Sequence, residues 1–323
     1  MQIKKLKPIT PEKWGEVNEL NRQMVEDFLA DSTELSAASI KSYRSNLMIF
    51  FVWCYEHLNN KSFAEIRSLD FKRFVNWMSE RKCSSADIRA KKSSVSSFFT
   101  YIETYYMDDY PSFRNPINKS IKLPSMNARV EKEPLTIAEF DNLVSVLEER
   151  KEYAKIAYLL FALETGARKG EIRQLLKNAV DIAPKISSNG APMYETPVIR
   201  AKGRGKEGKP RTFIFGQKTM DAFKRWVDTR DDDCEYMFIQ TVGGKTKQAS
   251  PTFFNNWHDS DFDKIVGRKT WPHLLRSSRA TQLSEEMNVD IKRISKLLGH
   301  SNTQITEVYI KRQENDSVED LLL

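Results

Sequence analysis

Cysteine is scarce in this chain. Its 323 residues include only Cys54, Cys83 and Cys234, which lie far apart and form no C-x-x-C pair. Three scattered thiols cannot make a paired disulfide framework, and they lack the spacing of a zinc site. We therefore expect a reduced, cytosolic setting in which the thiols are ordinary core or surface groups.

Long apolar runs are also missing. A run such as Leu159–Leu163 is far shorter than the roughly 20 residues that a helix needs to cross a bilayer. The chain begins Met-Gln-Ile-Lys-Lys, and no apolar stretch of the kind found in secretory signals follows. The sequence thus predicts neither a membrane partner nor secretion.

Motifs for metal and nucleotide chemistry are absent as well. The chain has no Walker A loop, no H-E-x-x-H pattern and no zinc-type spacing of Cys and His. A two-metal nuclease would need several convergent carboxylates. The one acidic cluster of note, Asp231-Asp232-Asp233, follows an expected helix and is explained by a solvated turn. We predict no metal and no cofactor.

Positive charge, in contrast, is in excess. The chain has 51 Lys and Arg against 44 Asp and Glu, a formal net charge of +7 and a pI of about 9.1. Hydrophobic residues make up 40% and charged residues 29%, which is typical of a folded globular protein. A basic chain favours polyanions, because Lys and Arg release the counterions condensed on nucleic acid. Charge alone is weak evidence, since many basic proteins bind no nucleic acid.

Helical periodicity marks the first part of the chain. Apolar residues recur at steps of three and four over Ser39–Tyr55, Phe71–Met78 and Val95–Tyr106. Residues 81–94 are basic and rich in Ser, which fits either a solvated loop and helix face or a surface that follows DNA phosphates. The candidate DNA contacts in this part of the chain are Lys41, Arg44, Arg89, Lys91 and Lys92.

A boundary follows these helices. Pro111, Pro116, Pro124 and Pro134 punctuate a segment with little helical periodicity. We expect a helical domain over 1–119, a linker over 120–133 and a second domain over 134–323. The second domain opens with Thr136-Ile137-Ala138-Glu139, the pattern of a helix capping box.

The second domain has a mixed pattern. One apolar helix is expected through Ile156–Leu163, ending near Gly166, and three further helices are expected at Lys218–Val227, Leu274–Leu283 and Ile291–Leu298. Strand-like runs occupy Val180–Ile182, Thr196–Ala201 and Arg211–Phe215. The fold class predicted for the chain is mainly α with a small antiparallel β-sheet.

Four short segments carry candidate chemistry. They are T-G-x-R-x-x-E at Thr165–Glu171, Lys202-Gly203, H-x-x-R at His273–Arg276, and Leu297–His300 followed by Tyr309. Each alone has an ordinary structural explanation, such as a surface salt bridge, a solvated pair of cationic groups one helical turn apart, or a packed tyrosine.

In this order, the segments resemble the active-site signature of the tyrosine site-specific recombinase family, which includes phage integrases and Xer-type recombinases. His300 follows Arg276 by 24 residues and Tyr309 follows His300 by nine, both close to the family's spacing. The residue types of Thr165–Glu171 and of L-L-G-H-S at Leu297–Ser301 also match the family's motifs. The resemblance is specific over 134–309, whereas residues 20–120 look like the family's core-binding domain mainly by length and position.

The resemblance implies a catalytic set of Arg168, Lys202, His273, Arg276, His300 and Tyr309, with Glu171 in support. In the family the tyrosine forms a 3′-phosphotyrosyl bond, and a hairpin lysine protonates the leaving 5′ oxygen. The chemistry agrees, because guanidinium groups match the extra negative charge on a pentavalent phosphorus. A phenol with a pKa near 10 also needs a cationic site to become a nucleophile.

The identity of the hairpin lysine stays open. Lys202-Gly203 matches the family's K-G, but Lys206 and Lys209 lie in the same loop. Arg204, Lys206 and Lys209 are also candidate DNA contacts. The hairpin lies further along the chain from Arg168 than in many family members, and Ser277 stands where the family often has Arg or His.

Further implications concern assembly. The resemblance implies a metal-independent enzyme whose two domains close around double-stranded DNA. A monomer or weak dimer would form a homotetramer on two DNA sites and pass through a Holliday junction, with possible accessory DNA-bending or directionality factors. The location would be the cytoplasm, on the prokaryotic nucleoid. About 20 residues precede the first clear helix, which favours a simple-site recombinase of Xer-like or mobile-element type.

The last residues carry a separate expectation. The chain ends in Leu321, Leu322 and Leu323, which are costly to expose unless they dock. In the family such a tail packs into a neighbouring protomer; docking onto its own domain is the alternative.

Two other functions fit parts of the pattern. One is a type IB topoisomerase, which relaxes DNA through the same tyrosine chemistry without synapsis. The other is a catalytically idle DNA-binding protein of the same fold, although every expected active-site position is filled.

Overall fold

The computed structural model describes residues 6–117, 121–125, 133–188, 190–201, 208–285 and 287–299. These residues form two compact units, one up to residue 125 and one from residue 133. Each unit has its own hydrophobic core. The predicted linker over 120–133 lies largely outside the described residues, so its bounds stay a prediction.

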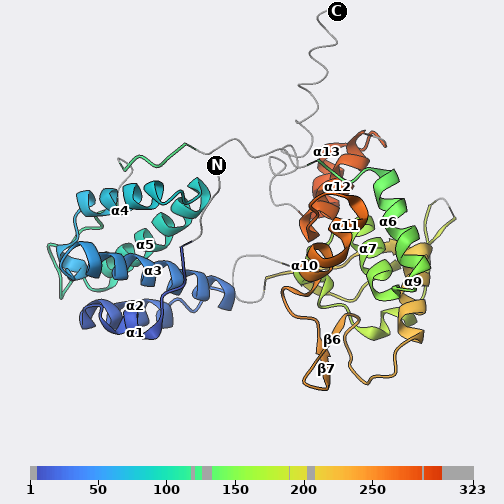
Figure 1. Ribbon diagram of the computed structural model, residues 1–323, viewed down its shortest axis with the longest axis horizontal. Helices are drawn as coiled ribbons and strands as arrows, with labels where there is room; N and C mark the ends of the chain where they lie inside the picture. Colours follow the sequence, from blue (N-terminus) through green and yellow to red (C-terminus); the bar gives the residue numbers. More distant parts are fainter. Residues whose placement is uncertain are drawn as a thin grey trace, which may run out of the picture. The chain divides into compact units, whose positions relative to one another are not determined.

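The first unit is all helical (Figure 1). Its elements are α1 (Pro11–Gly15), α2 (Glu19–Asp31), α3 (Ala37–His57), the 3-10 turn η1 (Phe63–Glu65), α4 (Ser68–Glu80) and α5 (Ser85–Tyr105). The helices predicted within α3, α4 and α5 are confirmed. Their inward faces share a cluster of buried aromatic rings, among which the Phe50 and Phe74 centroids lie 5.1 Å apart. Such packed rings contribute more than their buried area alone.

Helix α5 is longer than the sequence predicts. It begins at Ser85, after Ser84 accepts a hydrogen bond from the backbone of Asp87 at the helix N-terminus. Lys91 breaks the apolar pattern here, because it points inward at 3% exposure and its ammonium lies 2.6 Å from the Asp87 carboxylate. The basic, Ser-rich segment is therefore a short connection over 81–84 followed by the first half of α5.

The second unit contains the remaining helices. They are α6 (Ile137–Glu149), α7 (Tyr153–Thr165), α8 (Lys169–Ile172), the 3-10 helix η2 (Lys177–Asp181), α9 (Gln217–Asp228), α10 (Phe253–Trp257), the π-helical turn η3 (His258–Phe262), α11 (Asp263–Val266), α12 (Pro272–Glu285) and α13 (Ile291–Leu298). The predicted capping box is confirmed, because Thr136 and Glu139 exchange side-chain to backbone hydrogen bonds of 3.1 and 2.9 Å. The helices predicted within α7, α9, α12 and α13 are confirmed as well.

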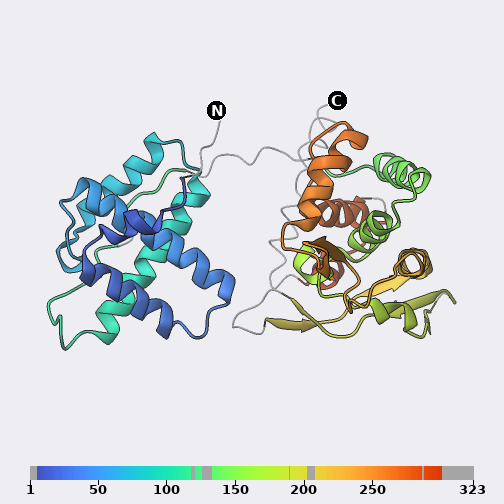
Figure 2. The same cartoon turned by 60° about the horizontal axis from the view of Figure 1, so that its bottom comes forward.

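Short antiparallel strands lie along one side of this unit (Figure 2). They are β1 (Lys185–Ile186), β2 (Pro192–Glu195), β3 (Ile199–Ala201), β4 (Lys209–Arg211), β5 (Ile214–Gly216), β6 (Ile239–Val242) and β7 (Lys245–Gln248). Among the described residues they pair as β1-β2-β5, β3-β4 and β6-β7. The predicted fold class, mainly α with a small antiparallel sheet, is confirmed.

Two strand predictions need correction. Val180–Ile182 is not a strand, because η2 runs over Lys177–Asp181 and ends there. The run Arg211–Phe215 is divided between β4 and β5, which belong to different sheets. The extra residues between 182 and 195 form the β1–β2 hairpin, which joins β5 and not the β3–β4 pair.

Helix α7 is the centre of the second core. Its residues from Ile156 to Ala162 are all buried, which explains why the sequence is apolar on every side. α6, α9 and α12 pack around it. At 13 residues α7 is a core helix, and no helix in the described ranges is long and apolar enough to cross a membrane.

Candidate active site

The turn that ends α7 brings three helices together. Gly166 has a left-handed backbone, with φ of 61°, that lets the chain reverse toward α8. A Cβ atom built on it would lie 2.4 Å from Leu298 Cδ2 and 3.8 Å from Arg276 Cγ. Glycine is required here both by the backbone angle and by the close approach of α12 and α13.

Glu171 holds Arg168 from two sides. The backbone N–H of Arg168 donates to Glu171 Oε2 at 2.7 Å, and Arg168 Nη1 donates to Oε1 at 3.0 Å. Glu171 is buried, whereas the side chain of Arg168 stays 30% exposed. The carboxylate therefore fixes both the backbone and the guanidinium of Arg168 and leaves part of that guanidinium accessible.

Arg276 links the ends of two helices. Its side chain is fully buried on α12, where Nη1 donates to the Gly166 carbonyl at 2.6 Å and Nη2 to the Leu298 carbonyl at 2.5 Å. The Leu298 carbonyl belongs to the C-terminal end of α13, where the helix dipole favours a cation. His273 lies one turn earlier on α12 and is exposed.

Arg211 also belongs to this cluster, although the sequence analysis missed it. Its Nη1 donates to the Leu298 carbonyl at 3.0 Å, its Nη2 donates to the Leu297 carbonyl, and Nη1 lies 3.7 Å from Glu171 Oε2. Burial lowers the pKa of Arg211, and the negative charge of Glu171 opposes that shift. The signal was the alternation of Arg211 with the buried Phe213 and Phe215, which places all three on one side of an extended chain.

These contacts form a closed ring. Arg168 is bound to Glu171, Glu171 lies beside Arg211, and the Leu298 carbonyl accepts from both Arg211 and Arg276. Arg276 completes the ring through Gly166, two residues before Arg168. Segments far apart in the sequence thus meet at one cationic cluster on the second unit.

Several predicted site residues lie outside the described residues. They are Lys202, Arg204, Lys206, His300 and Tyr309, together with the C-terminal leucines. Their roles remain predictions. His300 directly follows Gly299, and Gly299 lies close to the Arg211 guanidinium. A Cβ atom built on Gly299 would be 3.0 Å from Arg211 Nη1. Lys209 is exposed on β4 opposite Ala201, so the choice among the three hairpin lysines stays open.

The candidate DNA contacts of the first unit differ in their surroundings. Arg89 and Lys92 line a hollow of about 540 Å³ on α5 together with the polar side chains of Ser93, Ser96, Ser97 and Thr100. Lys41 is exposed on α3, and Arg44 is paired with Glu26 at 2.7 Å. The buried Lys91 holds Asp87 instead of presenting its charge to solvent, so we leave it out of the proposed contacts.

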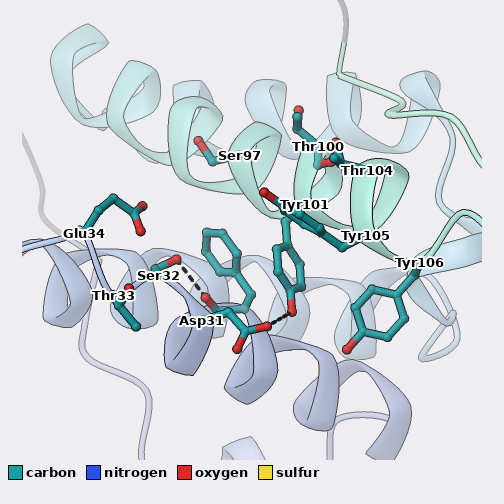
Figure 3. Close-up of a pocket in the computed structure, with 11 residues that line it drawn as sticks. Asp31, Ser32, Thr33, Glu34, Ser97, Thr100, Tyr101, Thr104, Tyr105 and Tyr106 are labelled. Carbon is teal, nitrogen blue, oxygen red and sulfur yellow. Dashed lines mark hydrogen bonds between the residues drawn. The ribbon is translucent and has the colours of Figure 1, made fainter.

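Another hollow of the first unit has a different chemistry. It measures about 750 Å³ between α2 and α5 and is lined by Asp31, Glu34 and several tyrosines (Figure 3). Tyr101 donates to Asp31 at 2.5 Å, and burial together with this hydrogen bond raises the pKa of Tyr101. None of the described residues that line it is Lys or Arg. Because carboxylates repel phosphate, we assign this hollow no part in DNA binding.

The acidic run 231–233 has a structural role. Asp232 accepts two hydrogen bonds from Arg230, of 2.9 and 2.6 Å, and these lower the pKa of the Asp232 carboxyl. Arg230 in turn donates to the carbonyls of Cys234 and Tyr236. Among the described residues, no group of three or more His, Cys, Asp or Glu side chains is placed to hold a metal ion.

A buried histidine supports the start of α12. His258 Nδ1 lies 2.8 Å from Thr270 Oγ1, and His258 Nε2 lies 3.2 Å from the Tyr158 hydroxyl. Because Thr270 donates its hydroxyl proton to Asp263 at 2.8 Å, His258 must donate from Nδ1 and accept at Nε2. Burial lowers the pKa of His258 to about 3, so its ring stays neutral.

This neutral ring predicts acid sensitivity. The unfolded state binds a proton below pH 6.5, whereas folded His258 stays neutral to about pH 3, so stability falls as the pH is lowered from 7 to 5. We expect a loss of about 2 kcal/mol over that interval from this residue. Urea unfolding at pH 7 and at pH 5 measures this loss of stability. Hydrogen exchange of the α7 amides at the same two pH values is the second measurement. His258→Gln should remove this part of the pH dependence, and an unchanged dependence would contradict the assignment.

Gly166 gives a second test. Gly166→Ala should destabilise the second unit by at least about 2 kcal/mol more than Gly267→Ala, because overpacking adds to backbone strain. Gly267 is a matched control, since it also ends a helix with φ of 77° but has nothing within 4 Å of an added Cβ. Urea unfolding of the full chain compares the two. Equal losses would mean that α13 moves away without cost.

Comparisons with known proteins agree with the two units. Residues 133–316 match the phage integrase family, and residues 16–107 match the phage integrase N-terminal SAM-like domain. The first match alone spans more than half of the chain. The chain belongs to the phage integrase family. The resemblance to tyrosine recombinases that the sequence predicts is confirmed.

Individual relatives and solved structures resemble this chain over most of its length. It is 30% identical to the SPbeta prophage-derived recombinase-like protein YomM of Bacillus subtilis, over 94% of this chain and 90% of that protein. It is 27% identical to tyrosine recombinase XerA of Thermococcus onnurineus, over 77% and 78%. The fold matches that of the Tn1549 transposon integrase in complex with transposon right end DNA, with a TM-score of 0.67 and 17% identity over 94% and 100% of the two chains. The XerH recombinase bound to palindromic difH substrate gives 0.64 and 16% over 99% and 91%.

Proposed function

We propose that the chain is a metal-independent, site-specific DNA recombinase that cuts and rejoins DNA through a 3′-phosphotyrosyl intermediate. The observation that supports this most is the ring that gathers Arg168, Glu171 and Arg276 against the end of α13. That end leads directly into His300, and Tyr309 follows nine residues later. Such a ring, built from distant segments, would supply the cationic site that the proposed reaction needs.

Two arginines would stabilise the phosphate. Guanidinium groups stay charged at all relevant pH values and match the geometry of phosphate oxygens. Arg168 is suited because Glu171 holds one side of it while 30% of its side chain stays exposed. Arg276 would contribute from the α12 side once DNA is bound. Donors fixed in advance lower the barrier without reorganising during the reaction.

The cleavage step balances with groups of this chain. The Tyr309 oxygen attacks phosphorus and forms the phosphotyrosyl bond, while the bond from phosphorus to the 5′ oxygen breaks. The phenolic proton passes to His273, His300 or water, and a hairpin lysine (Lys202, Lys206 or Lys209) protonates the 5′ oxygen. No bond energy is lost to water, so attack by a 5′ hydroxyl of another strand reverses the step and completes strand exchange.

The first unit would hold the DNA. Arg89, Lys92 and Lys41 offer cations on α3 and α5, and the serines beside Arg89 add neutral donors for phosphate oxygens. The sequence places this unit at 1–119 and the catalytic unit at 134–323, joined by 120–133. We further propose four protomers on two sites, a Holliday-junction intermediate, and docking of the C-terminal leucines into a neighbouring protomer.

A suicide substrate tests the proposal. The binding site is first selected from random-sequence DNA, and a nick is then placed so that the released fragment diffuses away and traps the adduct. We expect a covalent protein–DNA complex on a denaturing gel, in EDTA as well as in Mg²⁺. An adduct only with Mg²⁺ would contradict metal independence. No adduct on bound DNA would favour the idle DNA-binding protein, and relaxation of plasmids without any recombinant product would favour a topoisomerase.

A further inference from the structure

The β3–β4 hairpin is too small to hold its own position. Each strand has three residues, and the two strands pair through Ile199–Arg211, Arg200–Pro210 and Ala201–Lys209. An isolated two-stranded hairpin of this length is at best marginally stable in water. Residues 202–208, which include Lys202 and Lys206, connect the two strands in sequence. Whatever fixes these strands therefore fixes the points where that connection begins and ends.

Pro210 shows which groups of β3 face away from β4. Proline has no N–H, so Pro210 must stand in a non-hydrogen-bonded pair with Arg200. In an antiparallel ladder, pairs that exchange hydrogen bonds alternate with pairs whose N–H and C=O groups point outward. The peptide groups of Arg200 therefore point away from β4.

The side-chain amide of Gln174 hydrogen-bonds with both outward groups of Arg200, its N–H and its carbonyl. The N–H of Arg200 donates to Gln174 Oε1 at 3.0 Å, and Gln174 Nε2 donates to the Arg200 carbonyl at 2.9 Å. The side-chain amide thus pairs with β3 as the peptide of a third strand would. Gln174 Nε2 also donates to the Gly170 carbonyl at 2.9 Å. This residue is anchored in the cationic site, because its backbone N–H donates to the Glu171 carbonyl at 3.0 Å.

The other strand is held by Arg211. This residue ends β4, and its guanidinium reaches the Leu298 carbonyl and lies near Glu171. Both strands are therefore tied to the same short segment around Glu171, one through Gln174 and one through Arg211. A pair of anchors on opposite strands fixes the hairpin against sliding and tilting.

We propose that Gln174 is a positioning residue for the proton transfer to the leaving 5′ oxygen, with Arg211 as its counterpart on β4. The inference rests on the proposed function, in which a lysine of this hairpin supplies that proton. Gln174 touches neither phosphate nor leaving group in this role. It sets the place of β3, whose last residue directly precedes Lys202.

A substrate with sulfur in place of the bridging 5′ oxygen separates this role from a general structural one. Cleavage then breaks the bond from phosphorus to sulfur and releases a thiolate, which needs no proton because thiols are far stronger acids than alcohols. On the oxygen substrate, we expect Gln174→Leu to slow single-turnover cleavage by about 10- to 100-fold, a part of what general acid catalysis supplies. On the sulfur substrate, we expect cleavage within about threefold of wild type.

Two further variants sharpen the test. Gln174→Glu keeps the acceptor for the Arg200 N–H but loses the donor, so it should show the same rescue by sulfur at nearly unchanged side-chain size. Gln217→Leu is a matched control, because its amide also makes two hydrogen bonds in this unit, with Tyr194 and Asp221. It should cleave both substrates like wild type. Circular dichroism and DNA-binding affinity show that each variant is folded.

The outcomes are distinct. Wild-type rates for both Gln174 variants on the oxygen substrate would overturn the proposal. An equal loss on oxygen and sulfur substrates would also overturn it, because the residue would then support the fold or the phosphate contacts instead of proton transfer. A wild-type protein that forms no adduct with either substrate would overturn the proposed function itself.

Discussion

A Tyr309→Phe variant is expected to bind its DNA site with unchanged affinity and to form no covalent adduct. The substitution removes one oxygen, which is the atom that attacks phosphorus, and keeps the aromatic ring. No neighbouring hydroxyl or water should replace it, because a nucleophile must approach in line at about 3 Å. The loss should therefore exceed any loss from a supporting residue. Adduct formation on a nicked substrate measures it directly.

The control for this experiment is a tyrosine that the proposal leaves out. Tyr105 is 73% exposed on α5 of the first unit, and Tyr105→Phe should leave adduct formation unchanged. Band-shift titration of both variants separates binding from chemistry. If Tyr309→Phe still gave the adduct, the nucleophile would be another residue, and digestion of the adduct to a DNA-linked peptide would identify it.

Arg276→Lys is expected to reduce single-turnover cleavage by about 10²- to 10³-fold, the cost typical of losing one fixed donor to a reacting oxyanion. Lysine keeps the charge but cannot reach two carbonyls with a planar fork. The Gly166 and Leu298 carbonyls, 2.6 and 2.5 Å from the guanidinium, would compete for a single ammonium group. The Leu298 carbonyl at the end of α13 would then lose its contact with residue 276 as well. We therefore expect His300, which follows this end, to be held less well in place.

A matched substitution controls for the loss of an arginine fork. Arg225 donates to both carboxylate oxygens of Glu148, at 2.9 and 2.6 Å, on the outside of the same unit. Arg225→Lys should cleave within about twofold of wild type, because exposed ion pairs contribute little. Cleavage by Arg276→Lys within about threefold of wild type would mean that Arg276 acts only as a support for the helix ends.

Periodic elements could be predicted from the sequence, because burial on one face leaves a repeat. Helix α13 has the predicted bounds, since Ile294 and Leu298 mark the buried face and Gly299 ends it. The start of α5 could not be predicted, because Lys91 occupies an inward position and is neutralised by Asp87. The false strand at Val180–Ile182 shows the limit for short apolar runs, which fit a partly buried 3-10 helix equally well.

Some residues of the site could likewise be predicted from the sequence, and others could not. The motif order placed Arg168, Glu171 and Arg276 in one cluster, and the structure does bring them together. Arg211 and Gln174 were not predicted from the sequence, because their partners are mainly the main-chain groups of Leu298 and Arg200. A backbone carbonyl exists at every position, so a hydrogen bond to it produces no pattern of residue types in the sequence.

The same dependence on main-chain partners has an evolutionary consequence. Arg211 would hold the Leu297 carbonyl equally well whatever side chain stood at 297, which faces solvent. Substitutions at that position are therefore expected to accumulate among descendants of this chain without disturbing the contacts of Arg211. The surfaces beside the site can then adapt to new DNA sequences while the reaction stays the same.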